Sequence, residues 1–240
     1  MRQTDETLNY ILDGKSHVFA SSMEEWLNSS RRFTTFVDSF RDKIRKKIRV
    51  TQDPENLLDL RLELETAYLL LREPRLHIVY EPQLSEKVRG PDFAVTFTTS
   101  LTFMVEVTRL RAEPGEHRSE PTQSTERLAD AICSKLGQMM PQLSNVLIVG
   151  VDAPSVVGGD LRGMMLRVQQ RAERSDAIFF QRYGFRDRAD FFRHYQRLSE
   201  ILIRSSNVNT VKPIVTYVNT QAKYPLPSKV RTVLYHSQTI

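Results

Sequence analysis

The sequence predicts an α/β protein in which a mixed β-sheet is flanked by helices. Its 240 residues are 40% hydrophobic and 26% charged, a balance typical of a globular chain that can bury a large core. Segments with helical spacing alternate along the chain with short β-type runs. One of these runs, 145–151, is continuously apolar, which is typical of a strand that is buried on both faces and parallel to its neighbours.

The N-terminal part of the chain is mainly helical in pattern. Residues 1–28 give a weak, mixed signal, whereas apolar residues recur at helical spacing over 30–50 and predict an amphipathic helix. The other face of this helix carries the basic residues Arg41, Lys43, Arg45, Lys46, Lys47 and Arg49. That face is either an ordinary solvated surface, the simpler interpretation, or a surface that contacts phosphate groups. Asp53 and Pro54 then provide an N-cap and a first-turn proline for a leucine-rich helix, which ends before Pro74.

Three β-type runs follow, at 76–80, 92–98 and 101–110. The last two form a hairpin around Thr99 and Ser100. In the third run apolar residues alternate with a set that includes Glu106 and Thr108, and a strand places these two sets on opposite faces.

Helices and strands then alternate toward the C-terminus. Residues 111–124 are polar, with two prolines and a glycine, and predict a mobile loop. The remaining expected elements are helices at 125–140, 161–174 and 188–204 and strands at 145–151 and 211–219. An aromatic segment between the last two helices is expected to be core or a partner surface. The order of elements predicts a sheet covered by helices on both faces. We expect a single domain, with residues 1–50 as a helical extension packed on the core formed by 51–240.

Composition excludes several classes of protein. No run approaches the ~18 apolar residues of a membrane span, and the N-terminal residues lack the apolar stretch of a signal peptide, so a cytoplasmic protein without a membrane partner is expected. Cys133 is the only cysteine, which excludes an intrachain disulfide and a multi-cysteine zinc site. The 5 histidines include no His-x-x-x-His pair, so a bound metal would be held by carboxylates.

The basic residues are mostly arginine. Of 34 basic residues 9 are lysine, which leaves 25 arginines, and the formal net charge is +5. Arginine binds phosphate bidentately and stacks on bases, so this bias is compatible with a nucleic-acid partner. A GC-rich genome produces the same bias without any function, and the two explanations are equally weighted.

Two carboxylates lie on the predicted hairpin. Asp92 opens one strand and Glu106 lies on the next, and counting in twos places both on one face if the register brings those faces together. Converging carboxylates are the hard oxygen ligands of a divalent cation that activates water for phosphodiester hydrolysis.

The segment Gly90-Pro91-Asp92-Phe93-Ala94-Val95, followed after thirteen residues by Val105-Glu106-Val107-Thr108, resembles the PD-(D/E)XK nuclease superfamily. The resemblance covers about residues 54–151 and implies a restriction-endonuclease-like core with N-terminal and C-terminal helical additions. It implies that Asp92, Glu106 and the carbonyl of Val107 hold Mg²⁺ or Mn²⁺. It also implies hydrolysis of DNA, more than RNA, that leaves a 5′-phosphate.

In that family an acid on the first core helix often completes the site. Glu63 and Glu65 are the candidates, and the helical wheel favours Glu65, which falls on the shoulder of the apolar face. An ordinary surface glutamate is the competing interpretation.

The chain departs from the family pattern at one position. Thr108 stands where the resemblance leads us to expect a lysine, and its hydroxyl can hold water or phosphate but supplies no positive charge. Lys135 falls at the border of the apolar face of the helix after the third strand, where it either reaches solvent or meets an acidic partner. If that partner is Asp92 or Glu106, Lys135 replaces the missing lysine.

Three functional hypotheses remain open. The first is a metal-dependent endonuclease acting on DNA, and the second is an inactive nuclease-fold domain that binds nucleic acid or protein. In the third, the motif is a coincidence in an unrelated α/β protein. A homodimer is compatible with each.

Overall fold

A six-stranded mixed sheet forms the centre of the molecule. The structure, a computed structural model, describes residues 2–13, 20–51, 53–82, 90–111, 121–151, 161–205 and 215–238. The strands lie in the order β1-β2-β3-β4-β5-β6. They are β1 (Leu76–Tyr80), β2 (Phe93–Phe97), β3 (Leu101–Leu110), β4 (Ser144–Val151), β5 (Leu198–Ser205) and β6 (Val215–Val218). Strands β3, β4 and β5 are parallel, and the outer pairings are antiparallel.

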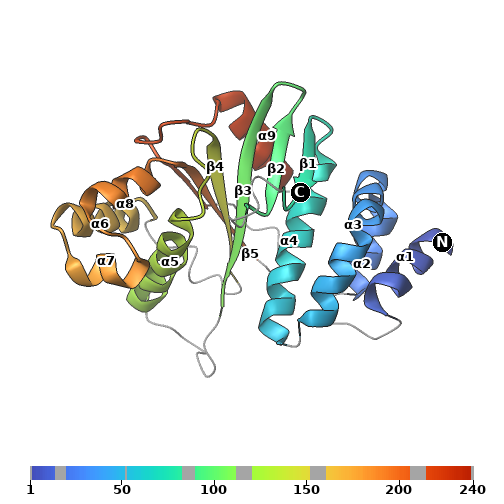
Figure 1. Ribbon diagram of the computed structural model, residues 1–240. Coiled ribbons are helices and arrows are strands. Elements are labelled where there is room, and N and C mark those ends of the chain that lie inside the picture. Colours follow the sequence, from blue (N-terminus) through green and yellow to red (C-terminus); the bar gives the residue numbers. More distant parts are fainter. Residues whose placement is uncertain are drawn as a thin grey trace.

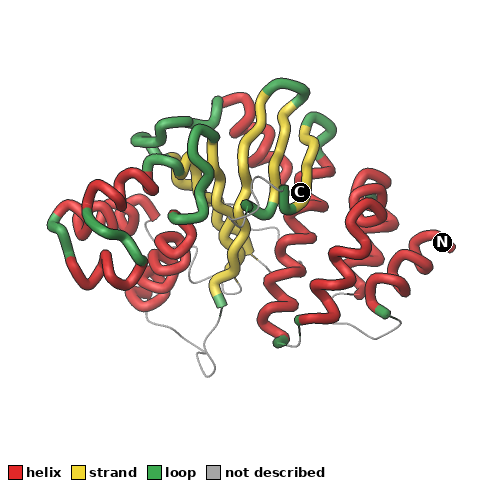
Figure 2. Tube along the Cα trace, in the orientation of Figure 1, coloured by secondary structure: helices red, strands yellow, loops and turns green. Residues whose placement is uncertain are grey.

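Helices cover both faces of this sheet, so the α/β class predicted from the sequence is confirmed (Figures 1 and 2). The first layer consists of α1 (Arg2–Leu12), α2 (Ala20–Ser29), α3 (Arg31–Val50), α4 (Pro54–Arg72) and α9 (Ser228–Gln238). The second consists of α5 (Pro121–Leu136), α6 (Leu161–Glu173), α7 (Ala177–Tyr183) and α8 (Arg188–Tyr195). Each helical layer packs on one face of the sheet and forms a hydrophobic core with it. Successive side chains of β4 point to opposite faces, so Val146 and Ile148 lie in the first core and Leu147 and Val149 in the second.

The N-terminal residues form two helices that pack on α3. Their sequence signal is weak because α1 and α2 bury few residues each, and tertiary contacts stabilise them. Trp26 of α2 stacks on Tyr68 of α4 at 5.6 Å between ring centroids and meets Phe33 of α3 edge-on. The extension therefore shares one core with the first layer.

The predicted helix over 188–204 is wrong in its second half. Helix α8 ends at Tyr195, and the chain continues as β5, which pairs with β4 and β6. The run Leu-Ser-Glu-Ile-Leu-Ile-Arg-Ser is buried on both faces, and such a run has no period of two to distinguish it from a buried helix.

Most other boundaries shift by a few residues. Helix α5 begins before the expected residue 125 and ends at Leu136, and the strand expected over 211–219 is described as β6 only from Val215. Most of the predicted loop at 111–124 lies outside the described residues. Within the aromatic segment, Phe179, Phe180 and Phe185 are buried in the second core.

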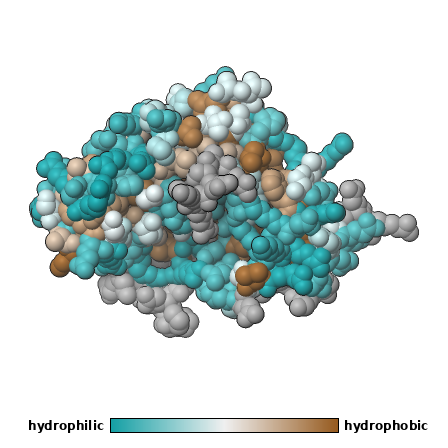
Figure 3. Space-filling model, in the orientation of Figure 1, coloured by the Kyte–Doolittle hydropathy of each residue, from teal (hydrophilic) through white to brown (hydrophobic). Residues whose placement is uncertain are grey.

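The surface in Figure 3 is mainly hydrophilic, with apolar residues in small patches. Among the described helices, none combines the length and the apolar character required to cross a bilayer.

A buried ion pair joins α4 to β5. Arg204 Nη1 lies 3.2 Å from Glu65 Oε1, Arg204 Nη2 donates to Thr66 Oγ1 at 3.1 Å, and both charged side chains are at most 10% exposed. The Nε atom of Arg204 has no hydrogen-bond partner among the described residues. This guanidinium depends on Glu65 for compensation of its charge.

Removing Glu65 while Arg204 remains should therefore destabilise the folded protein. We expect Glu65→Leu to lower the free energy of unfolding by about 3 to 5 kcal/mol, because it leaves a buried charge unpaired. The double variant Glu65→Leu/Arg204→Met should recover much of that loss. Urea unfolding measures both, and Arg182→Met, which breaks a pair with Asp130 in which the two side chains are 56% and 31% exposed, serves as the control with little effect. Equal losses in the single and double variants would contradict this role.

Candidate functional site

The candidate site lies where strand β2 begins beside a longer strand. Register pairs Phe93 with Val105, and β3 continues to Leu110 beside β4 alone. Among the described residues, the backbone of β3 beyond Val105 thus has no strand partner on the β2 side. This step in the sheet edge leaves room for side chains from both helical layers.

Asp92 lies at this edge of the sheet, beside the part of β3 that β2 does not pair with. It stands one residue before β2, opposite Glu106 by continuation of the register, and its Oδ2 accepts the Val107 N–H at 2.7 Å. Its own carbonyl accepts the Glu81 N–H at 2.7 Å. Gly90 lies close to the carbonyl of Pro82, where a Cβ atom would stand only 2.6 Å from the oxygen, so the turn into Asp92 requires glycine.

Glu106 projects toward helix α5. Lys135 Nζ donates to Glu106 Oε1 at 2.8 Å and also lies 3.3 Å from Gln138 Oε1. Glu106 is only 4% exposed, whereas the Lys135 side chain retains 19% exposure. The acidic partner expected for Lys135 is therefore Glu106.

A cavity of about 350 Å³ opens beside these residues. Asp92, Val107, Thr108 and Lys135 line it on the sheet and α5 sides. Helices α3 and α4 supply the opposite wall, in which Lys47 Nζ donates to Glu63 Oε2 at 2.7 Å. The cavity thus brings together carboxylates and ammonium groups from both layers.

Burial and like charges shape the electrostatics of Asp92. Desolvation, followed by the nearby carboxylates of Glu106 and Glu63, raises the pKa of Asp92 to about 8. The Val107 N–H and the Lys135 ammonium act in the opposite direction and are too weak to cancel this effect. The Asp92 carboxyl therefore retains a proton across much of the neutral range unless a metal cation binds beside it.

The two candidate acids on α4, Glu63 and Glu65, lie on different sides of the helix. Glu63 lines the cavity, whereas Glu65 pairs with Arg204 on the other flank of α4 and does not line it. Residues two apart on a helix differ by about 200°, so only one of the pair can face a given site. The α4 carboxylate at this cavity is therefore Glu63 rather than the favoured Glu65. Thr108 is half-buried in the lining, as a residue next to Val107 on β3.

Sequence reasoning missed the role of Lys47 and Tyr80. Tyr80 Oη donates to Glu63 Oε2 at 2.8 Å, and Lys47 also bridges to Glu81 at 2.5 Å. Burial lowers the pKa of Lys47, but Glu63 and Glu81 outweigh it and the net pKa is raised. Lys47 belongs to the predicted basic face of α3, and no local signal separated it from its neighbours.

The basic face of α3 is largely neutralised within the chain. Lys43 pairs with Glu81 at 2.7 Å, Arg45 and Arg49 pair with Asp13, and Lys47 pairs with Glu63. Such pairing leaves few free cations for a phosphate backbone. The solvated surface remains the simpler interpretation of this face.

The donor set suits a hard cation only in part. Within the described ranges no group of three His, Cys, Asp or Glu side chains is placed to hold a metal ion. Asp92 and Glu106 provide two carboxylates, and the backbone at Val107 adjoins them. Two mutually repelling buried carboxylates are nevertheless a setting that a divalent cation relieves.

Comparison with known proteins finds no matching family model, no similar curated protein and no similar solved structure. A functional conclusion must therefore come from the chemistry of the site itself.

The raised pKa of Asp92 predicts that the folded protein loses stability as the pH rises in metal-free buffer. The folded protein keeps the proton up to about pH 8, whereas the unfolded chain releases it near 3.8, so the contribution of this group to stability declines as pH rises between those values. Asp92→Asn does not titrate. We compare the free energy of unfolding of this variant with that of the wild type at pH 5 and at pH 9. Raising the pH should shift the difference in favour of the variant by on the order of a few kcal/mol, because only the wild type loses stability as Asp92 ionises. Urea titrations in EDTA measure this, and a difference independent of pH would contradict the burial of an ionisable Asp92.

Proposed function

We propose that this protein is a PD-(D/E)XK-type, divalent-metal-dependent nuclease that hydrolyses phosphodiester bonds in DNA. The observation that carries the proposal is the convergence of Asp92 and Glu106 at the start of β2, with the Lys135 ammonium 2.8 Å from Glu106. Paired carboxylates beside a lysine are the groups that such hydrolysis requires.

Asp92 and Glu106 would hold Mg²⁺ or Mn²⁺ together with the carbonyl of Val107. When bound, the cation supplies an activated water and stabilises charge on the scissile phosphate. The Asp92–Val107 hydrogen bond fixes one carboxylate oxygen and leaves the other for ligation. Glu63, across the cavity, supports a bound water through its carboxylate, which Lys47 and Tyr80 orient.

Lys135 would supply the positive charge that Thr108 lacks. Its ammonium lies at the cavity wall, so it orients Glu106 and donates a hydrogen bond toward a phosphate oxygen. The Thr108 hydroxyl lines the same cavity and can hold water or phosphate.

An inactive nuclease-fold domain that binds nucleic acid or protein is the second candidate. The observation in its favour is that Glu106 is already neutralised by Lys135, as expected for a purely structural ion pair. Metal binding separates the two candidates.

Mg²⁺ or Mn²⁺ should stabilise the wild type but not Asp92→Ala. At millimolar cation the wild-type melting temperature should rise by a few degrees, because the ion binds only the folded protein. The rise should be larger at pH 8.5 than at pH 6.5, since the cation displaces the Asp92 proton. NaCl at matched ionic strength controls for general ionic effects. Identical shifts in wild type and Asp92→Ala would reject this site.

Lys135→Met should abolish metal-dependent cleavage while preserving the metal-induced thermal shift. The substitution removes the ammonium but keeps side-chain volume, and it frees Glu106 for the cation. Cleavage of labelled single- and double-stranded DNA with Mg²⁺ or Mn²⁺ measures the effect. Lys229→Met, at an exposed position of α9, is the matched control. Full activity of Lys135→Met would reject its role, and an inactive wild type that still binds metal would favour the non-catalytic domain.

A further inference from the structure

The net charge of the chain is concentrated in one segment. Residues 161–197, which form α6, α7 and α8, contain nine arginines and four acids, and nine minus four equals the +5 of the whole chain. The remaining 25 basic and 25 acidic residues cancel. All of this segment lies within the described residues, and none of its cations is lysine.

Most of these arginines point into solvent. Eight of the nine are exposed: Arg162, Arg167, Arg171, Arg174, Arg182, Arg186, Arg188 and Arg193. Arg186 and Arg193 share one buried carboxylate, Asp190, so that pair of cations is only half neutralised. Arg171 pairs with Asp176 at 2.8 Å, and Arg182 pairs with Asp130 of α5. Arg162, Arg167, Arg174 and Arg188 make no ion pair with any described residue. The segment therefore keeps an excess of positive charge at its surface.

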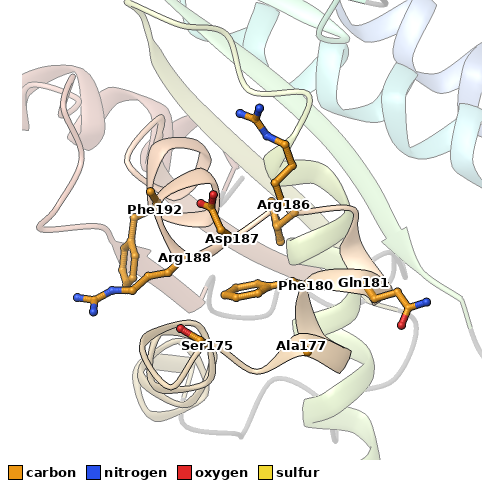
Figure 4. Close-up of a pocket in the computed structure, with 10 residues that line it drawn as sticks. Ser175, Ala177, Phe180, Gln181, Arg186, Asp187, Arg188 and Phe192 are labelled. Atoms are coloured by element: carbon orange, nitrogen blue, oxygen red, sulfur yellow. The ribbon is translucent and has the colours of Figure 1, made fainter.

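An aromatic groove lies among these arginines. It has a volume of about 950 Å³, and Phe180, Phe185 and Phe192 line it together with Arg186 and Arg188. In Figure 4 the Phe180 ring points toward Phe192 and Arg188, while Arg186 extends away. The Arg188 guanidinium lies 6.0 Å from the centroid of the Phe192 ring. Flat rings and planar cations are thus combined in one open groove.

We propose that the groove formed by α7 and α8 binds single-stranded DNA, with bases against Phe192 and phosphates on the surrounding arginines. Stacking on aromatic rings together with backbone contacts from arginine is the general mode of binding for single strands. This surface is separate from the residues around Asp92, so it is a second contact with the polymer. The choice of DNA as the polymer rests on the proposed nuclease function.

The spread of charge favours a nucleic acid over an acidic peptide. A short peptide in the groove would need only the cations on its rim. Arg162, Arg167 and Arg174 belong to α6 and the turn after it and do not line the groove. Cations distributed over several helices match the repeated charge of a phosphate backbone.

Binding should be measured without catalysis. A fluorescein-labelled 20-nucleotide single strand is titrated with Asp92→Asn in EDTA, with fluorescence anisotropy as the readout. Binding in EDTA does not require the metal site, so this experiment can succeed if the nuclease proposal fails, and the reverse also holds. We expect binding at low salt that weakens steeply as salt increases.

Charge reversal then locates the surface. Arg174→Glu/Arg188→Glu should weaken binding by at least tenfold, because both side chains are exposed and unpaired within the described structure. The control is Arg41→Glu/Lys46→Glu on the basic face of α3, which changes the charge equally and should change affinity by less than threefold. Equal losses in the two double variants, or no binding by the parent protein, would overturn the proposal.

The aromatic contribution has its own test. Phe192→Ala should weaken single-strand binding by roughly tenfold, and Phe192→Tyr should restore it, provided circular dichroism shows both variants folded. Heparin and an acidic apolar peptide serve as competing probes. Tighter binding of the peptide than of the single strand, or an unchanged affinity in Phe192→Ala, would overturn the assignment to single-stranded DNA.

Discussion

The site depends on the difference in length between two neighbouring strands. Strand β2 begins at Phe93, opposite Val105, while β3 continues to Leu110. A sheet edge exposed in this way needs a partner for its backbone, and the Asp92 carboxylate accepts the N–H of Val107. A single hydrogen bond thus ends the pairing of β2 with β3 and brings a carboxylate into the gap between the helical layers. Longer pairing would place a backbone strand where the cavity now lies.

This gap also determines the electrostatic character of the site. Glu106 faces α5, Glu63 comes from α4, and Asp92 lies near both carboxylates with little exposure to water. Lys135 pairs with Glu106 and Lys47 pairs with Glu63, whereas Asp92 makes no ion pair with a described residue and is favoured in its charged form only by the Val107 N–H and, at longer range, by Lys135. Burial and the two neighbouring carboxylates therefore raise the pKa of Asp92. An environment that disfavours a buried negative charge favours whatever positive group approaches it.

The sequence predicted what depends on local periodicity. Alternation along β3 placed Glu106 on the face of Asp92, and the helical wheel placed Lys135 at the edge of a buried face, as the structure shows. The choice between Glu63 and Glu65 depends on how α4 is rotated against the sheet, which neighbouring elements decide. The same limit applies to β5, because its continuous burial removes the period that identifies a strand.

The density of basic residues in the sequence does not show where positive charge remains unpaired in the structure. The basic face of α3 is the densest cationic run in the sequence, yet Asp13, Glu63 and Glu81 neutralise much of it. The arginines of α6–α8 are more dispersed in sequence, and the acids among them are partly occupied as helix caps, since Asp176 and Asp187 accept backbone N–H groups. Asp176 also pairs with Arg171 at 2.8 Å, and Asp130 of α5 pairs with Arg182, so the exposed cations of residues 161–197 that make no ion pair with a described residue are Arg162, Arg167, Arg174 and Arg188. The surface potential therefore follows the local pairing of charges, and the more dispersed cations are the ones available to a polyanion.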